Sequence, residues 1–90
     1  MADVHADAGR YGDALTAATA ALAITEDSGD RRSSSEALNI LGTIEALHGQ
    51  LDAASQWHGQ ALELATATGY QMEIQEALVG LAEVHRRAGR

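Results

Sequence analysis

The residues of this sequence whose types could do chemistry include four histidines, the adjacent Arg86 and Arg87, and 13 carboxylates. A histidine cluster would suit a zinc ion, whose ligands lie about 2 Å from the metal. His48 and His58 flank one predicted turn, but the sequence holds no HExxH motif and no second pair of ligands. No nucleophile beside a base and no phosphate-cradling glycine-rich loop can be identified either. We therefore predict no catalytic residue, no metal and no cofactor, and hence a protein that is not an enzyme.

Arg86 and Arg87 are the sharpest chemical feature. A pair of guanidinium groups suits a carboxylate or a phosphate. Their position just before Gly89 allows a second interpretation, because cations in the last turn of a helix stabilise the negative end of its dipole. The sequence alone leaves both interpretations open.

The composition predicts an all-α protein. Strong helix formers are abundant, Pro and Phe are absent, and β-branched residues are scarce. The net charge of -7 argues against nucleic acid and anionic membranes as partners. Asp3 and Asp7 and the lack of an apolar run exclude a signal peptide and a membrane span. The absence of Cys fits the cytoplasm, and the use of Arg for every basic residue suggests a bacterial origin.

A 40-residue repeat organises the chain. Residues 81–90 keep six of the ten residues at 1–10. The same interval separates several glycines and small or apolar residues: Gly9, Gly49 and Gly89; Gly29 and Gly69; Ala14, Ala21 and Leu22, which return as Ala54, Ala61 and Leu62. The chain thus holds about two and a quarter copies in a single domain, residues 1–90. Because His5 and His85 lie two repeats apart, they cannot share one metal ion.

Each copy is predicted to contain two helices that end at glycines. Apolar residues spaced by three and four precede Gly49, which suits the left-handed position after a helix. Ser33 and Glu36 form a capping box before the same run, and Asp13 and Asp52 can cap the second helix of each pair. The predicted helices span about residues 1–8, 12–28, 34–48, 52–68 and 72–88.

Residues 36–65 resemble a tetratricopeptide repeat. The matching positions are Leu41-Gly42 for the Leu-Gly pair, Ala54 for the helix-crossing alanine, and Ala61-Leu62 for the late Ala-Leu pair. The resemblance implies a right-handed superhelical solenoid of antiparallel helix pairs, of the 40-residue kind found in bacterial regulators, kinesin light chains and polarity adaptors. Small residues are expected at Gly42, Ala54 and Ala61, where the helices cross closely. The Lys and Asn set with which some family members grip a terminal carboxylate is absent, so no ligand specificity is carried over.

In this family the first helix of each pair lines the concave face. The residues expected there are Glu36, Asn39, Thr43 and Ala46 or Leu47 in the middle copy, and Glu76, Val79, Glu83, Arg86 and Arg87 in the next copy. Spacing by three and four places each set on one helix face. We predict a groove that is acidic at one end, basic at the other, and able to hold a peptide or a helix. The alternative is that these charges only solvate an exposed face.

The main hypothesis is a protein–protein interaction scaffold, a fragment of a longer repeat array. Repeats bury their apolar faces only against their neighbours. We therefore expect the flank of Leu78, Leu81 and Val84 to drive formation of a homo-oligomer through the open repeat ends, with exchanged helices as one form of it. The runner-up hypothesis is a regulatory sensor segment of a multidomain transcriptional regulator or signalling ATPase, and the third is a structural spacer.

Overall fold

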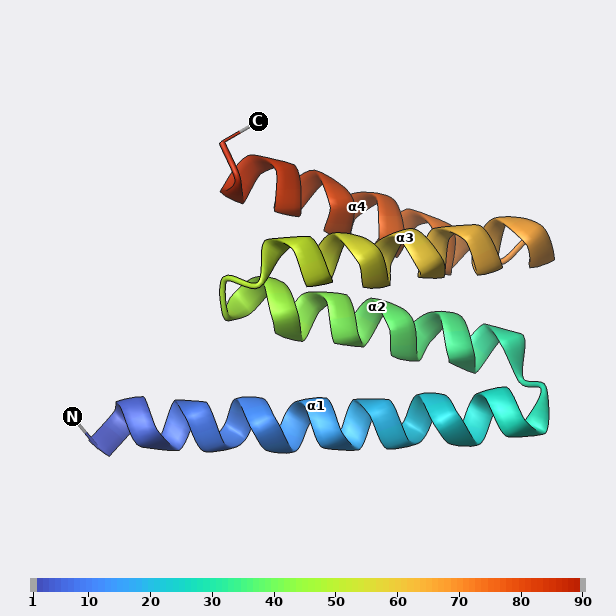
Figure 1. The fold of residues 1–90 in the computed structure, drawn as a ribbon. Helices are drawn as coiled ribbons and strands as arrows, with labels where there is room; N and C mark the ends of the chain where they lie inside the picture. The colour runs from blue at the N-terminus through green and yellow to red at the C-terminus, as the bar shows by residue number, and fades with distance from the viewer. Residues whose placement is uncertain (1, 90) are drawn as a thin grey trace.

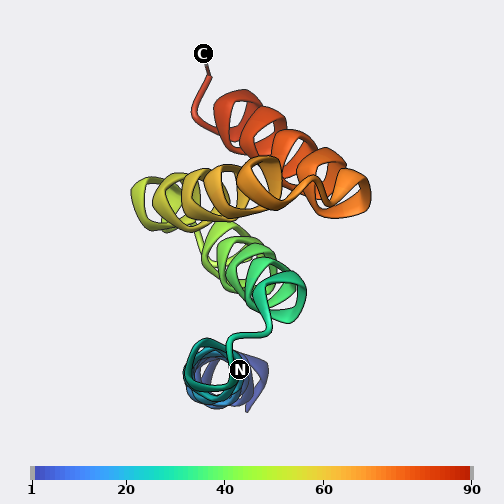
Figure 2. The same ribbon diagram turned by 90° about the vertical axis from the view of Figure 1, so that its right-hand side faces the viewer.

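The computed structural model describes residues 2–89, with side chains from residue 10 onward. It consists of four α-helices in which each helix runs antiparallel to the one before it (Figure 1). They are α1 (Ala2–Ser28), α2 (Arg31–Leu47), α3 (Leu51–Thr68) and α4 (Gln71–Arg87). In the perpendicular view the helices form a stack, with α1 at one end and α4 at the other (Figure 2). The predicted all-α helical repeat solenoid is confirmed.

The turns between helices are short and depend on glycine. Gly29, Gly49 and Gly69 have φ angles of 77°, 79° and 76°, in the left-handed region where a Cβ would be strained. After Gly69, the amide of Tyr70 donates to the carbonyl of Ala65 at 3.0 Å, which satisfies one of the free carbonyl groups at the end of α3. The glycines that the repeat marks as helix ends therefore do end α1, α2 and α3.

Gly9 is the exception, and the prediction of separate helices at 1–8 and 12–28 is wrong. Helix α1 is continuous from Ala2 to Ser28, so Asp13 lies inside the helix and caps nothing. A chain reversal is stabilised by packing between the two helices that it joins. At Gly9, continuing the helix keeps the backbone hydrogen bonds at a cost of about 1 kcal/mol for one helical glycine. Met1 lies outside the described residues.

The predicted helix caps also need correction. Helix α2 begins three residues earlier than expected, because Asp30 follows the turn directly and its Oδ1 accepts a hydrogen bond from the Ser33 amide at 3.1 Å. This hydrogen bond lowers the pKa of Asp30. Ser33 therefore lies in the first turn and is not the cap. Helix α3 begins at Leu51 after Gln50, which makes no capping bond through its side chain, so Asp52 also lies within the first turn.

Small residues hold the helices together. Ala54, Ala61, Ala65 and Ala77 have no exposed surface, so α3 packs closely against α2 and α4. One apolar cluster joins all four helices around Leu41, and a smaller one joins the far ends of α2, α3 and α4: Ala46, Leu51, Ala54 and Val84. Within the described residues, no helix is long and apolar enough to cross a membrane.

Candidate functional site: the groove between helices α2 and α4

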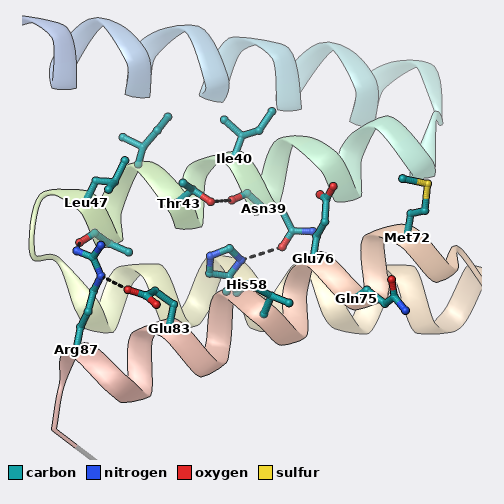
Figure 3. A pocket seen from close by; sticks show the side chains of 14 residues that line it. Asn39, Ile40, Thr43, Leu47, His58, Met72, Gln75, Glu76, Glu83 and Arg87 are labelled. Carbon is teal, nitrogen blue, oxygen red and sulfur yellow. Dashed lines mark hydrogen bonds and ion pairs between the residues drawn. The ribbon is translucent and has the colours of Figure 1, made fainter.

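A groove of about 670 Å³ lies between α2 and α4, with α3 forming its floor (Figure 3). Both walls are helices that occupy the first position of their repeat, and the packing of α4 against α2 and α3 sets the width of the groove. The lining residues are Asn39, Ile40, Thr43, Ile44, Ala46 and Leu47 from α2, His58 from α3, and Met72, Gln75, Glu76, Val79, Gly80, Glu83 and Arg87 from α4.

The groove is mainly apolar and open to solvent. Ile40, Leu47, Met72 and Val79 line it, and each is between 52% and 69% exposed. They are four of the six large apolar side chains that are exposed among the described residues. Apolar side chains gathered in a concave surface usually mark an interaction site, because leaving them in water is unfavourable.

His58 reaches the floor of the groove from α3 and lies between two glycines. A Cβ on Gly42 of α2 would come within 2.5 Å of the His58 ring, and a Cβ on Gly80 of α4 would come closer still. No larger residue fits at either position without moving the ring. The glycines therefore let one buried side chain contact both walls, and burial lowers the pKa of His58.

Asn39 fixes which nitrogen of His58 carries the proton. Its Nδ2 donates to the backbone carbonyl of Glu73 at 3.2 Å, so its Oδ1 must face His58, whose Nδ1 lies 2.8 Å away. Because Oδ1 can only accept, Nδ1 is the donor, and Nε2 of the neutral ring is left as an acceptor. The bridge joins α2, α3 and α4, and it places an acceptor on an apolar floor.

The basic end of the groove is partly neutralised. Both Arg86 and Arg87 donate to the carboxylate of Glu83, with Arg87 Nε lying 2.6 Å from Glu83 Oε2. These bonds lower the pKa of Glu83 to about 2. Arg87 also donates from Nη1 to the carbonyl of Ala46 at 3.2 Å, which ties α4 to α2. Of the two sequence interpretations, the arginines do lie in the last turn of α4, and they form no open pair that faces the groove.

The acidic end is different. Glu36 and Glu76 are both exposed, and no hydrogen bond or ion pair joins either to another described residue. Glu73 is buried beside them and its Oε2 lies 3.7 Å from Nε of Arg32. Of these three acids only Glu76 lines the groove, so this end carries one carboxylate with no hydrogen bond or ion pair to another described residue.

Seven of the nine predicted groove residues line the groove: Asn39, Thr43, Leu47, Glu76, Val79, Glu83 and Arg87. Ala46, offered as the alternative to Leu47, lines it too, whereas Glu36 and Arg86 do not. Sequence reasoning missed Ile40, Ile44, Met72, Gln75, His58 and Gly80. Ile40 and Met72 could have been found from their helical spacing to the predicted residues. His58 comes from the other helix of the pair, and only the three-dimensional contact reveals it.

His48, the other histidine that flanks the predicted turn between α2 and α3, makes different contacts. The ring of His48 stacks on Tyr11 of α1 with their centroids 4.0 Å apart, and the Tyr11 hydroxyl donates to Glu45 at 2.5 Å. His48 and His58 thus contact different helices. Within the part of the chain that the structure describes, no group of three possible ligands is placed to hold a metal ion.

Comparison with known proteins agrees with this architecture. A family model described as tetratricopeptide repeat matches residues 1–67, which is more than half of the chain. No curated protein and no solved structure matches the chain. The matched region includes α1, α2 and almost all of α3, and hence the complete helix pair with its Leu41-Gly42, Ala54 and Ala61-Leu62 positions. The chain belongs to the tetratricopeptide repeat family, whose repeats are typically non-catalytic protein–protein interaction modules.

Proposed function

We propose that this chain is a non-catalytic scaffold that binds an amphipathic, positively charged helix or peptide in the groove between α2 and α4. The observation that carries the proposal is the gathering of Ile40, Leu47, Met72 and Val79 in one concave surface. An amphipathic helix presents apolar side chains at positions i, i+3, i+4 and i+7, and such a row fits an apolar groove between two helices.

Charge supports a basic occupant. The chain has a net charge of -7, and Glu36 and Glu76 stand exposed and unpaired near the beginnings of α2 and α4. The two arginines at the other end share the carboxylate of Glu83 and so offer little to an acidic partner. A partner with Lys or Arg at the end that faces Glu76 would be steered to the groove and held in one orientation.

His58 adds a polar anchor to this occupant. Its Nε2 is an acceptor on an otherwise apolar floor. A partner hydroxyl or N–H group that reaches the floor would complete the hydrogen bonding of the ring, whereas a partner that covers it with apolar groups alone would leave the acceptor unsatisfied. We therefore expect one donor side chain among the apolar anchors of the partner.

A designed peptide tests the proposal directly. The probe is a helical peptide of about four turns with Leu at i, i+3, i+4 and i+7 and with Lys flanking the apolar face. The matched control is the same peptide with each Lys replaced by Glu. Isothermal titration calorimetry should detect binding of the Lys peptide and at least about tenfold weaker binding of the Glu peptide, a difference of about 1.4 kcal/mol. Equal affinities would contradict the charge argument.

Two neighbouring substitutions test the location. Val79 lines the groove and Leu78 does not, although both are exposed apolar residues of α4. Val79→Glu should weaken binding of the Lys peptide by at least about tenfold, because it places a carboxylate among the apolar anchors. Leu78→Glu should leave binding unchanged. If Val79→Glu binds as the wild type does, the groove is not the site.

We propose in addition that the chain self-associates through its open repeat ends. Leu78 supports this, because it is half exposed although it belongs to the flank that the next helix of an array would cover. Light scattering that gives a clean monomer at every concentration from tens of micromolar up to about 500 µM, a range suited to a small interface, would contradict it. A bacterial origin, a longer parent protein and a regulatory setting stay predictions of the sequence.

A further inference from the structure

Among the residues whose side chains are described, two large apolar ones are exposed outside the groove, Ile24 on α1 and Leu78 on α4. They lie on the helices at opposite ends of the stack (Figure 2). The repeat gives each an equivalent 40 residues away, Leu64 on α3 and Leu38 on α2. Both equivalents pack into the same apolar cluster, where α3 covers α2. The α2–α3 contact buries Leu38 and partly buries Leu64, whereas the equivalent positions Leu78 on α4 and Ile24 on α1 are exposed.

The open face of α4 matches the covered face of α2. Leu38 and Leu41 of α2 are 4% and 0% exposed. Their equivalents in α4, Leu78 and Leu81, are exposed and half-buried respectively, because no helix covers α4 on the side where α3 covers α2.

The open face of α1 matches the face with which α3 covers α2. On α3 this face is a stripe of Ala54, Trp57, Ala61 and Leu64. The equivalent stripe on α1 is Ala14, Ala17, Ala21 and Ile24, in which Ala17, Ala21 and Ile24 are exposed. Ala14 and Ala21 repeat the small residues of the close crossing, and Ile24 repeats the branched aliphatic residue at the end of the stripe. Ala17 is smaller than its equivalent Trp57 and fills less of the contact.

We propose that a second copy of this chain completes the contact: α1 of one copy docks on α4 of another, in the place that α3 takes on α2. The contact continues the α2–α3 packing from one molecule into the next. It is head-to-tail, so each copy keeps one open face at each end and chains of copies can grow. The proposal gives a geometry to the self-association proposed above, and it does not involve the groove.

The unbroken helix α1 allows this docking. If residues 2–8 turned back at Gly9, as the repeat predicts, they would pack beside residues 12–20. Docking would place residues 82–88 of the other copy at that same position. The two segments would then compete for it. Because α1 continues straight (Figure 1), residues 2–8 do not fold back beside residues 12–20, and that face of α1 is left open.

Complementary substitutions test the head-to-tail arrangement. Sedimentation velocity of the wild-type chain between about 10 and 500 µM, a range suited to a small interface, should show a mean mass that rises past that of a dimer. Ile24→Glu breaks the α1 face and Leu78→Glu breaks the α4 face, so each variant alone should be a monomer. In an equimolar mixture, the Ile24→Glu chain keeps an intact α4 face and the Leu78→Glu chain keeps an intact α1 face. These two faces can pair, so the mixture should form a 1:1 dimer that grows no further.

The outcomes separate this proposal from the others. A monomeric mixture, or dimers formed by either variant alone, would overturn the head-to-tail contact even if the wild type associates. A monomeric wild type would overturn all self-association and leave the groove proposal standing. Both substituted positions are exposed, so far-ultraviolet circular dichroism of each variant should match the wild type. Val79→Glu serves as the control, because it alters the groove and should associate like the wild type.

Discussion

Helices α2 and α4 occupy the same position in consecutive repeats, yet their side chains have very different surroundings. Leu38 is 4% exposed and its equivalent Leu78 is 50% exposed. Asn39 is buried and bridges three helices, whereas its equivalent Val79 stands exposed in the groove. Both segments form helices of 17 residues. The local pattern determines the helix, and the number of neighbouring helices determines what each position contributes to stability.

This difference has a physical basis in repeat proteins. Each repeat contacts only its neighbours, so stability is close to a sum of terms for single repeats and for interfaces between them. Among the described residues, α2 is packed by α1, α3 and α4, while α4 is packed by α2 and α3 alone. Substitutions at equivalent positions in α2 and α4 should therefore have unequal effects, and measuring them tests how far nearest-neighbour packing explains the molecule.

The largest difference is expected between Leu38→Ala and Leu78→Ala. Removing the buried Leu38 side chain leaves a cavity in the cluster that joins all four helices and should lower the free energy of unfolding by about 2–5 kcal/mol. Half of the Leu78 side chain is already in water, so Leu78→Ala should cost less than about 1 kcal/mol. Urea denaturation followed by circular dichroism measures both.

This pair should be compared well below the concentration at which the chain self-associates, because a second copy would bury Leu78. Equal losses for the two variants would mean that α4 is covered by another molecule under the conditions used. A Leu78→Ala loss that grows with protein concentration would sharpen the comparison, since it would show burial supplied between molecules.

Gly42→Ala and Gly80→Ala test the contact of His58 with both helices. Each added Cβ meets the His58 ring, and we expect a loss of about 1–3 kcal/mol from overpacking. The loss should be larger for Gly42, because α2 is held by helices on both sides, whereas α4 can shift outward. Gly59→Ala in α3 is the control: nothing lies within 4 Å of its added Cβ, so higher helix propensity should raise stability by up to about 1 kcal/mol. If all three variants gain stability, the His58 ring does not fill this space.

Much of the fold could be predicted from the sequence, because the repeat recurs at residues whose role is local. Gly49 and Gly69 end helices through their left-handed conformation, and Ala54 and Ala61 fit close helix crossings whatever their neighbours are. The absence of a turn at Gly9 could not be predicted from the repeat, because a turn forms only where both of the helices that it joins gain packing. His58 shows the same limit, because its place in the groove depends on Gly80, which has no counterpart at Ile40 in the preceding repeat.

The pH dependence of stability tests the buried hydrogen bond between His58 and Asn39, which has no counterpart at Val79. Burial lowers the pKa of His58 below its ordinary value of 6.5, so the unfolded chain binds more protons than the folded one just below pH 6.5. Stability should fall as the pH drops from 6.5 toward the lower pKa of the folded state, and then level off for this group. His58→Gln should remove this part of the pH profile. A wild-type profile as flat as that of the variant between pH 7 and 5 would contradict a buried, neutral His58.

The smallest difference is expected between Arg86→Ala and Arg87→Ala. Both arginines donate to Glu83 in an exposed arrangement, and ion pairs of this kind contribute little because water and salt screen them. Arg87 differs in that its Nη1 also donates to the carbonyl of Ala46 on α2, a bond between helices that does not depend on net charge attraction alone. We therefore expect a small decrease in melting temperature for Arg87→Ala that persists in about 1 M salt, and a smaller one for Arg86→Ala that disappears there. The reverse order would mean that the position of α4 on α2 is set by the carboxylate of Glu83 and not by the bond to Ala46.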